Sequence, residues 1–435
     1  MAKVIPFRGI RYNPEKINNL SDVVTPPYDI IDDTAQKIFY ARNPYNIIRL
    51  ELGYQFPGDS EEDNRYTRAA ANYQKWLQEG VLIRETRETI YLYEQEFFIN
   101  KIKYQRTGFF ARVKLEELSE GKILPHEETL LKPKADRLAL MSECAANFSP
   151  VFAFYVDPEM VLDQEFQKIK EHDPDLALTD DLGEKHHIWT LTDPPLHQKI
   201  TNTLENQVLY IADGHHRYET ALEYYRRNRE KYPGSSYILM YLVNACDPGM
   251  VVLPTHRIVH SIPDFDLDSF QNKLEDYFRV EKINDSQPDN LADILKKQQE
   301  IGRTAFIMGT REPALYLLIL RDPDKVKELS PGKSPAWCSL DAAVLQVIVF
   351  QNLLKLSPEK IACQENITYT RDAEEALNAL NEDAQLIFLL NSTKVSQIMA
   401  VASAGDKMPQ KSTYFYPKLL TGLIINDLKD ELPHS

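Results

Sequence analysis

The sharpest change in hydrophobic pattern along the chain lies at residues 208–227. Residues 208–212 form an apolar run rich in β-branched and aromatic side chains, which predicts a strand. The apolar positions that follow recur at helical spacing and are Tyr218, Ala221, Leu222 and Tyr225. Asp213 and Gly214 lie where the chain must turn, and glycine tolerates backbone angles that a side chain forbids. The stretch therefore predicts a strand, a tight loop and a helix.

Similar patterns on either side predict a mixed succession of strands and helices. Strands are expected at 89–99, 104–114, 149–156, 185–191, 208–212 and 237–245. Helices are expected at 33–42, 66–79, 135–146, 163–171, 266–278, 290–300, 340–355 and 395–404. Beyond Ser261 helices alternate with short strands. We therefore expect an α+β protein with a first domain at 1–262 and a second α/β domain at 263–435.

Residues 47–52 alternate apolar and polar side chains and predict a further strand. Arg49 and Glu51, two residues apart, would lie on one face of it. Two interpretations stay open for this pair. It is either an ion pair with no role beyond the fold, or part of a functional site.

Size and composition narrow the class of protein. A chain of 435 residues exceeds what one hydrophobic core usually supports. Because no apolar run is long enough to cross a membrane and residues 1–10 lack a signal-peptide pattern, we expect a cytoplasmic protein with no membrane partner. The formal net charge of -15 argues against nucleic acid as a partner. The four cysteines form no C-x-x-C pair, so neither a zinc site nor a disulfide framework is expected.

The groups best suited to bind an anion are concentrated in the loop at 213–217. A helix N-terminus carries unsatisfied backbone N–H groups and a partial positive charge, and here it also holds His215, His216 and Arg217. These groups predict a phosphate site that includes the backbone of Gly214. The simpler alternative is a strand-to-helix corner whose histidines only pack or face solvent.

Two further polar clusters are candidates for the same site. The irregular segment at 124–137 contains His126 and Glu127 among other polar residues, and we expect this pair in one cleft with His215 and His216. The sequence there is not H-E-x-x-H, so no metal site is predicted. The histidines of 185–191 are interpreted as packing partners across the strand. His256 and Arg257, beside a proline turn, are candidates for anion contacts.

The segment at 407–418 is too polar for a core and too aromatic for a flexible linker. Lys411, Ser412 and Thr413 are the residues that would contact a phosphate if the segment closed over the first domain as a lid. The alternative is a strand that docks the C-terminus.

Several motifs carry a resemblance to known families. YIADGHHRYETAL resembles the D-G-x-H-R-x-x-A nucleotide loop of the ParB and sulfiredoxin superfamily, which includes a free-serine kinase. The motifs TPPYDII, NPYNIIRLEL, LPHEETL, SPVFAFY, ADGHHRYETA, LPTHRI and MPQKSTYFYPKLLTGL together resemble domain-of-unknown-function family 1015 across nearly the whole chain. The loop resemblance implies a ParB/sulfiredoxin-like first domain that binds nucleotide phosphates, with Thr220 among its contacts.

The resemblance also implies a reaction class. We expect a phosphotransferase that uses ATP or ADP and acts on a hydroxyl metabolite such as serine or phosphoserine. The candidate bases or magnesium ligands are Glu51, Glu127 and Asp213, and the other catalytic candidates are His126 and His216. Two alternatives stay open, namely a phosphatase acting on a metabolite such as phosphoserine and a nucleotide sensor without catalysis.

Overall fold

The computed structural model describes residues 2–129, 131–312 and 314–430. Contacts between Cα atoms divide the chain into two compact units. Unit 1 comprises residues 1–125, 129–251 and 417–435, and unit 2 comprises residues 126–128 and 252–416. Both units combine helices with sheets, which confirms the predicted α+β class. Within the described residues, no helix is long and apolar enough to span a bilayer.

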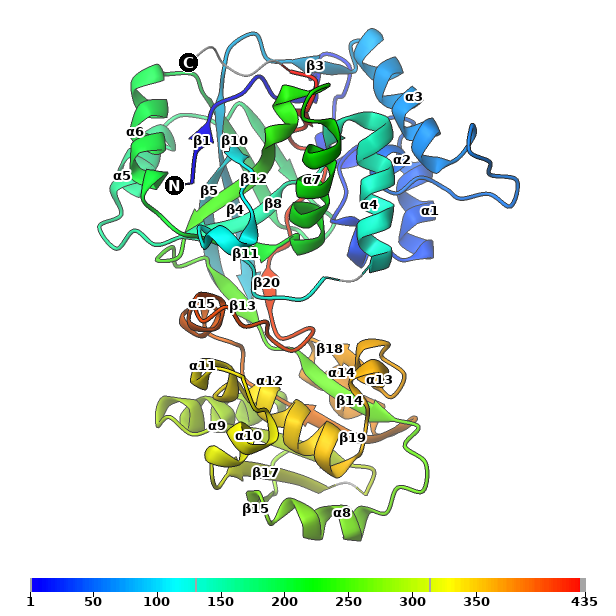
Figure 1. The fold of residues 1–435 in the computed structure, drawn as a ribbon, viewed down its shortest axis with the longest axis vertical. Helices are drawn as coiled ribbons and strands as arrows, with labels where there is room; N and C mark the ends of the chain where they lie inside the picture. Colours follow the sequence, from blue (N-terminus) through cyan, green and yellow to red (C-terminus); the bar gives the residue numbers. More distant parts are fainter. Residues whose placement is uncertain (1, 130, 313, 431–435) are drawn as a thin grey trace. The chain divides into compact units, whose positions relative to one another are not determined.

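Unit 1 is built on a large mixed sheet (Figure 1). Over the described residues this sheet has nine strands in the order β6-β11-β8-β12-β5-β4-β10-β9, with β1 paired to β5. β11 runs parallel to β6, β12 runs parallel to β8, and the other neighbours are antiparallel. The strands are β1 (Val4–Ile5), β4 (Ile90–Ile99), β5 (Ile102–Lys114), β6 (Ile123–Leu124), β8 (Val151–Tyr155), β9 (Leu176–Thr179), β10 (Lys185–Leu191), β11 (Leu209–Asp213) and β12 (Tyr237–Asn244).

Two small antiparallel pairs and several helices complete unit 1. The paired strands are β2 (Ile10–Tyr12) with β3 (Leu82–Arg84), and β7 (Ala146–Asn147) with β21 (Asn426–Asp427). The α-helices are α1 (Asp33–Arg42), α2 (Ile48–Glu51), α3 (Arg65–Gln78), α4 (Leu131–Cys144), α5 (Val161–Ile169), α6 (Pro194–Glu205) and α7 (His215–Asn228). The short 3-10 helices are η1 (Leu20–Asp22), η2 (Tyr28–Ile30), η3 (Leu118–Glu120) and η4 (Pro233–Ser236).

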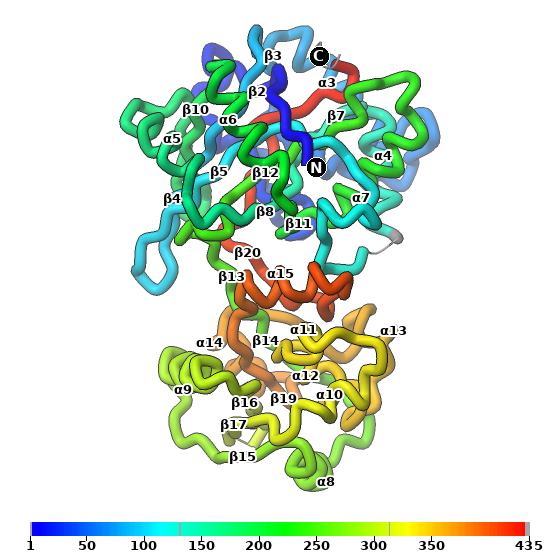
Figure 2. Tube along the Cα trace, turned by 60° about the vertical axis from the view of Figure 1, so that its left-hand side comes forward, coloured from blue at the N-terminus to red at the C-terminus, as the bar shows by residue number. Residues whose placement is uncertain are grey.

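One face of the large sheet is covered by helices α5, α6 and α7 (Figures 1 and 2). Their apolar residues, such as Phe166, Ile200 and Tyr218, pack in one core with Phe109 and Met240 of the sheet. Because side chains alternate across a strand, this core fixes which residues of β5 and β12 face the other way.

The other face of the sheet is held by the C-terminal residues. Arg112 of β5 donates from Nε to the Asn426 side chain at 2.6 Å and from Nη2 to the Asp427 carbonyl at 2.8 Å. Arg106, also of β5, donates to the Pro417 carbonyl at 2.6 Å. These contacts tie residues 417–428 to unit 1, although the sequence placed them in the second domain.

Unit 2 contains an antiparallel sheet that has six strands over the described residues, in the order β15-β17-β16-β19-β14-β18. Its strands are β14 (His256–His260), β15 (Phe278–Ile283), β16 (Ala305–Thr310), β17 (Ala314–Leu320), β18 (Ile367–Thr370) and β19 (Ala384–Leu389). β13 (Val251–Leu253) pairs with β20 (Tyr414–Tyr416) separately. Because β14 pairs with β18 and β19, His256 and Arg257 belong to unit 2 and not to the part of the chain that carries β11.

The helices of unit 2 cover residues from 267 to 403. They are α8 (Leu267–Leu274), α9 (Pro288–Glu300), α10 (Asp324–Leu329), α11 (Pro335–Cys338), α12 (Asp341–Val344), the π-helix η5 (Leu345–Leu353), α13 (Pro358–Ala362), α14 (Ala373–Ala379) and α15 (Val395–Ser403). Leu291 and Leu295 of α9 share a core with Ile307 of β16 and Ile387 of β19. The helix predicted at 266–278 is too long, because Phe278 already begins β15.

The strand predicted at 47–52 is wrong. Residues Ile48–Glu51 form helix α2 instead. The side chain of Asn46 explains the difference, because its Oδ1 accepts from the Ile48 amide at 2.9 Å while its Nδ2 donates to the Asp22 carbonyl at 2.8 Å. Such an asparagine offers the backbone a helical turn in place of a strand ladder.

Candidate functional site

The loop between β11 and α7 has the predicted strand–loop–helix form. β11 ends at Asp213, and α7 begins at His215. Gly214 between them has φ 89° and ψ 28°, a left-handed conformation that favours glycine. A Cβ atom there would lie 2.9 Å from Nε of Arg217, so the arginine side chain folds back over this glycine. Gly214 is thus required both by its backbone angles and by the close approach of Arg217.

Asp213 is the charged centre of the loop. The register of β11 against β8 shifts between Ile211 and Asp213, and such irregularities re-aim side chains at the end of a strand. Asp213 Oδ2 lies 3.3 Å from Nζ of Lys418 and 3.6 Å from Nη2 of Arg217. Burial opposes ionisation of Asp213, but Lys418, Arg217 and His215 outweigh it and hold its pKa well below the ordinary value. The carboxylate is therefore ionised at neutral pH.

Lys418 is the residue that sequence reasoning missed. It belongs to the same polar and aromatic segment as Lys411, and the aspartate–lysine contact is set by the path of residues 417–428 over the sheet. The carbonyl of Lys418 also accepts from Nε2 of Gln95 at 3.1 Å, which fixes the backbone there.

Arg217 and the next polar residues of α7 form hydrogen bonds to other segments of unit 1. Arg217 Nη1 donates to the Pro150 carbonyl, and its side chain is 11% exposed. The Thr220 hydroxyl is buried and lies 3.5 Å from the Lys134 carbonyl, which it contacts as donor. Glu219 accepts from the Thr129 hydroxyl at 2.6 Å and from Lys134 at 2.9 Å. The segment that follows His126 and Glu127 therefore contacts α7 through Thr129.

Glu51 lies in a buried polar cluster beside this loop. Its Oε1 lies 3.1 Å from Nη1 of Arg137 and accepts from the Ser149 hydroxyl at 2.9 Å. A small cavity of about 30 Å³ is lined by these three residues and by Arg217. That volume is enough for about one water molecule. The structure thus brings the predicted residues Glu51 and Arg217 to the same cavity.

Tyr28, from the TPPYDII motif, joins the same cluster. The Arg137 guanidinium lies 3.9 Å from the centre of its ring. Burial raises the pKa of Tyr28 to about 12, although the charges of Arg137 and Arg217 act in the opposite direction. Four of the motifs that carry the family resemblance therefore contribute to one neighbourhood in unit 1, through Tyr28, Glu51, Ser149 and Arg217.

Arg49 does not share a face with Glu51. Residues two apart on a helix point about 200° apart, in contrast to the same-face arrangement of a strand. Arg49 Nη2 donates to the Tyr40 carbonyl at 2.8 Å, and its guanidinium lies 4.4 Å from the centre of the Tyr40 ring. Arg49 is thus engaged in packing α1 against α2.

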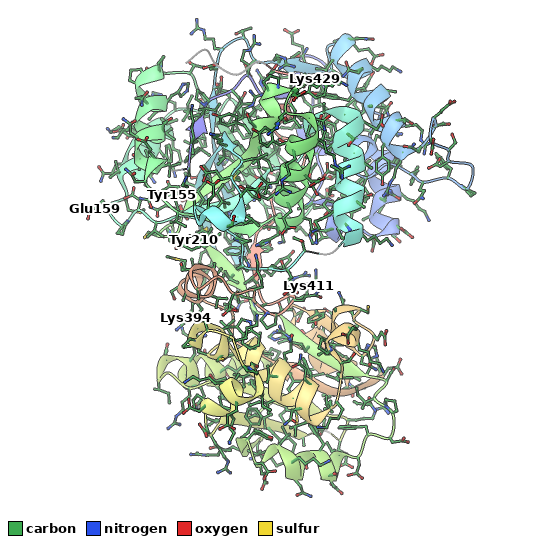
Figure 3. The ribbon with its side chains drawn as sticks, in the orientation of Figure 1. Tyr155, Glu159, Tyr210, Lys394, Lys411 and Lys429 are labelled. Carbon is green, nitrogen blue, oxygen red and sulfur yellow. The ribbon has the colours of Figure 1, made fainter. Side chains whose placement is uncertain are left out.

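Other predicted site residues belong to unit 2, where they form two pairs. His126 Nε2 lies 2.9 Å from the Thr413 hydroxyl, and the His126 carbonyl accepts from the Met408 amide at 2.8 Å. Arg257 Nη2 donates to the Lys411 carbonyl at 3.4 Å. Lys411 is labelled in Figure 3. That His126 and Glu127 share a cleft with His215 and His216 stays a prediction, as does the lid formed by Lys411, Ser412 and Thr413.

His256 and Arg257 are both buried in unit 2. His256 Nδ1 accepts from the Leu390 amide at 3.2 Å, and burial, followed by the charge of Arg257, lowers the pKa of His256 to about 4. Burial likewise lowers the pKa of Arg257 to about 10. Their role in anion binding stays a prediction. Ser412 donates from its hydroxyl to the Pro409 carbonyl at 2.6 Å and so stabilises the turn before β20.

The chain belongs to the DUF1015 family, described as a protein family of unknown function, whose model matches residues 4–343. No curated protein sequence matches the chain.

Solved structures resemble the chain more distantly. A free serine kinase in complex with AMP has 13% identity and a TM-score of 0.36, covering 73% of this chain and 92% of that one. A hypothetical protein from Pyrococcus furiosus has 12% identity and a TM-score of 0.35, covering 73% and 95%. SbnI from Staphylococcus aureus, truncated at its C-terminus, has 11% identity and a TM-score of 0.33, covering 72% and 85%.

Proposed function

We propose that unit 1 binds the phosphates of ATP or ADP at the N-terminus of α7 and transfers a phosphoryl group to or from a small hydroxyl metabolite. The observation that carries the proposal is the left-handed Gly214 at the start of a 14-residue helix, with Arg217 and Lys418 both placed against Asp213. Backbone amides at a helix N-terminus and two cations together form a site for phosphate oxygens. Serine or phosphoserine is the metabolite we favour, on the resemblance of the loop to the superfamily that includes a free-serine kinase.

The loop residues have distinct parts in this proposal. Arg217 and the first amides of α7 bind and orient phosphate oxygens, and Lys418 supplies further positive charge as the phosphoryl group moves. Phosphoryl transfer depends mainly on such positioning and electrostatic stabilisation. Asp213 keeps the two cations in place.

The base that accepts the hydroxyl proton is better sought elsewhere than at Asp213. A general base works best when its pKa lies near the working pH, and the pKa of Asp213 is held well below its ordinary value. Of the predicted bases, Glu51 remains within unit 1. Glu51 shares its cavity with Arg217, and we favour it for that reason. Asp213, being ionised, is the carboxylate from which a Mg²⁺ ligand would come.

The test is direct. The full chain is incubated with ATP, Mg²⁺ and serine, or with ADP, Mg²⁺ and phosphoserine, and ³¹P NMR follows the transfer. Transfer between nucleotide and serine in the wild type, lost in Arg217→Ala, supports the proposal. Release of inorganic phosphate from phosphoserine without nucleotide would instead identify a phosphatase. Binding of nucleotide without turnover of any acceptor would identify a sensor.

A further inference from the structure

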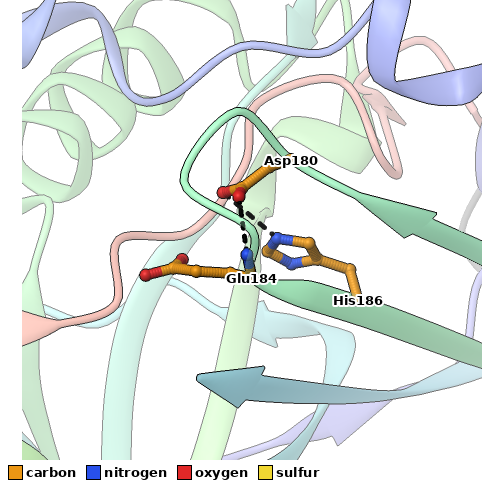
Figure 4. Close-up of side chains that lie close together, drawn as sticks. All are labelled: Asp180, Glu184 and His186. Carbon is orange, nitrogen blue, oxygen red and sulfur yellow. Dashed lines mark hydrogen bonds and ion pairs between the residues drawn. The ribbon is translucent and has the colours of Figure 1, made fainter. Parts of the chain in front are cut away.

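The turn between β9 and β10 gathers three metal-ligating side chains in unit 1 (Figure 4). Asp180, Glu184 and His186 each offer one ligand atom, and these atoms all lie within 4.8 Å of one another. His186 is 0% exposed and Glu184 is 4% exposed. The cluster is separate from the loop after β11, because β8, β12, β5 and β4 lie between β11 and β10 in the sheet.

The turn itself positions the carboxylate of Asp180. Asp180 Oδ1 accepts from the amides of Leu182 and Glu184, each at 2.9 Å. The amide of Gly183, at φ 80°, donates to the Asp180 carbonyl at 3.1 Å. Asp180 Oδ2 is directed to Nε2 of His186 at 3.4 Å. One oxygen of this carboxylate thus builds the turn while the other faces the imidazole.

His186 presents a buried nitrogen to this carboxylate without a hydrogen bond. Its Nδ1 lies 2.6 Å from the Tyr93 hydroxyl, whereas Nε2 is buried and forms no hydrogen bond to the described residues. An imidazole whose Nδ1–H donates to an oxygen keeps the lone pair on Nε2, which is the usual arrangement of a metal-ligating histidine. A buried polar atom of this kind costs free energy unless it finds a partner.

The distance between His186 and Asp180 fits two ligands of one metal ion. Two ligands on one tetrahedral ion, with ligand bonds of about 2.0–2.2 Å, lie about 3.4 Å apart. The distance from His186 Nε2 to Asp180 Oδ2 has this value.

We propose that Asp180, Glu184 and His186 bind a divalent first-row transition cation of the Zn²⁺ type, with water as a fourth ligand. An imidazole nitrogen beside carboxylate oxygens suits Zn²⁺ and its neighbours in the series, whereas Mg²⁺ and Ca²⁺ favour sites made of oxygen alone. Three protein ligands and one open position are typical of zinc sites that exchange a ligand. The site is independent of the proposed phosphotransfer.

The test measures metal binding by the untagged full chain. After treatment with a chelator, the chain is titrated with Zn²⁺ in a calorimeter, and one Zn²⁺ per chain is expected. His186→Ala and Asp180→Asn each remove one protein ligand. Each should weaken Zn²⁺ binding by on the order of 100-fold. Loss of a residue that only supports a metal ligand already weakens binding by about 10- to 100-fold. Asp180→Asn keeps an oxygen for the turn, so it tests the site even if His186→Ala fails to fold.

A matched control is the neighbouring histidine. His187 projects from the opposite face of β10, lies 3.5 Å from Glu94 and has a side chain that is 26% exposed. His187→Ala should leave Zn²⁺ affinity unchanged. Co²⁺ in place of Zn²⁺ should give the intense visible absorption of a four-coordinate ion in the wild type and in His187→Ala only. The proposal is overturned if the wild type takes up no Zn²⁺, or if Asp180→Asn binds it as tightly as the wild type.

Discussion

Lys418 lies 3.3 Å from Asp213, so residues from the C-terminal segment and from the β11–α7 loop share one charged contact within unit 1. The contact sets the charge of the candidate phosphate site, because Asp213 balances both Lys418 and Arg217. A phosphate that entered the site would compete with Asp213 for these two cations. Two properties of the site can therefore be measured. One is its affinity for a phosphate ligand, and the other is the pH-dependent stability that the ionised Asp213 gives to unit 1.

Arg217→Ala should weaken the binding of ADP to the full chain. The loss of one charge-assisted contact, worth roughly 1.5–3 kcal/mol, corresponds to a decrease in affinity of about 10- to 100-fold. The measurement is calorimetric titration with Mg·ADP. The matched control is Arg226→Ala on the same helix, because Arg226 has a 53% exposed side chain that pairs with Glu117. Equal affinities in the two variants would remove Arg217 from the site.

Lys418→Met should destabilise unit 1 in a pH-dependent way. The depressed pKa of Asp213 stabilises the folded state above the unfolded pKa of about 3.9, and this stability is lost as pH falls through the folded value. Without Lys418 the pKa of Asp213 rises toward its ordinary value. Urea unfolding at pH 7 should show a loss of roughly 1.5–3 kcal/mol. The difference between wild type and variant should shrink as pH falls below about 3.9 toward the depressed pKa of Asp213, and a difference that stays constant with pH would contradict the prediction.

Glu51→Gln should destabilise the chain, because Arg137 is 5% exposed and would lose a buried charged partner. Removing one member of a buried ion pair typically costs about 3–5 kcal/mol. Arg137 also pairs with Asp136, so the lower end of this range is expected. The free energy of unfolding in urea provides the measurement, with Glu61→Gln on the exposed loop as control. If Glu51 is also the base, the folded variant should bind nucleotide and lose turnover.

A chain that ends at residue 262 should fail to fold stably, even though it contains the whole predicted first domain. It lacks the C-terminal residues of unit 1, among them the buried side chains of Leu423, Ile425 and Leu428. It also leaves Arg112, which is 2% exposed, without its partners Asn426 and Asp427. Circular dichroism with thermal melting makes the comparison. A shortened chain that melts as the wild type does would show that unit 1 does not need residues 417–430.

Local patterns sufficed for the elements that carry the candidate site. The apolar run before Asp213 and the helical spacing after Gly214 predicted β11 and α7, because strand and helix periods differ within a few residues. The D-G-H-H-R sequence likewise indicated a loop that requires glycine, and the left-handed Gly214 bears this out. The alternation of apolar and polar residues gave the wrong prediction at Ile48–Glu51. There the side chain of Asn46 stabilises a helical turn by accepting from the Ile48 amide.

The amino-acid sequence by itself determined the α+β class, the family, and the strand–loop–helix around Gly214, since these can be read from short motifs and from patterns of residues that are close together in the chain. Only the tertiary structure decided which distant residues share a neighbourhood. Lys418 lies against Asp213, and Arg137 and Ser149 hold Glu51, because pairing across the sheet and the return of the C-terminus set these contacts. The same holds for Asp180 and His186, whose 3.4 Å separation follows from the β9–β10 turn and its hydrogen bonds.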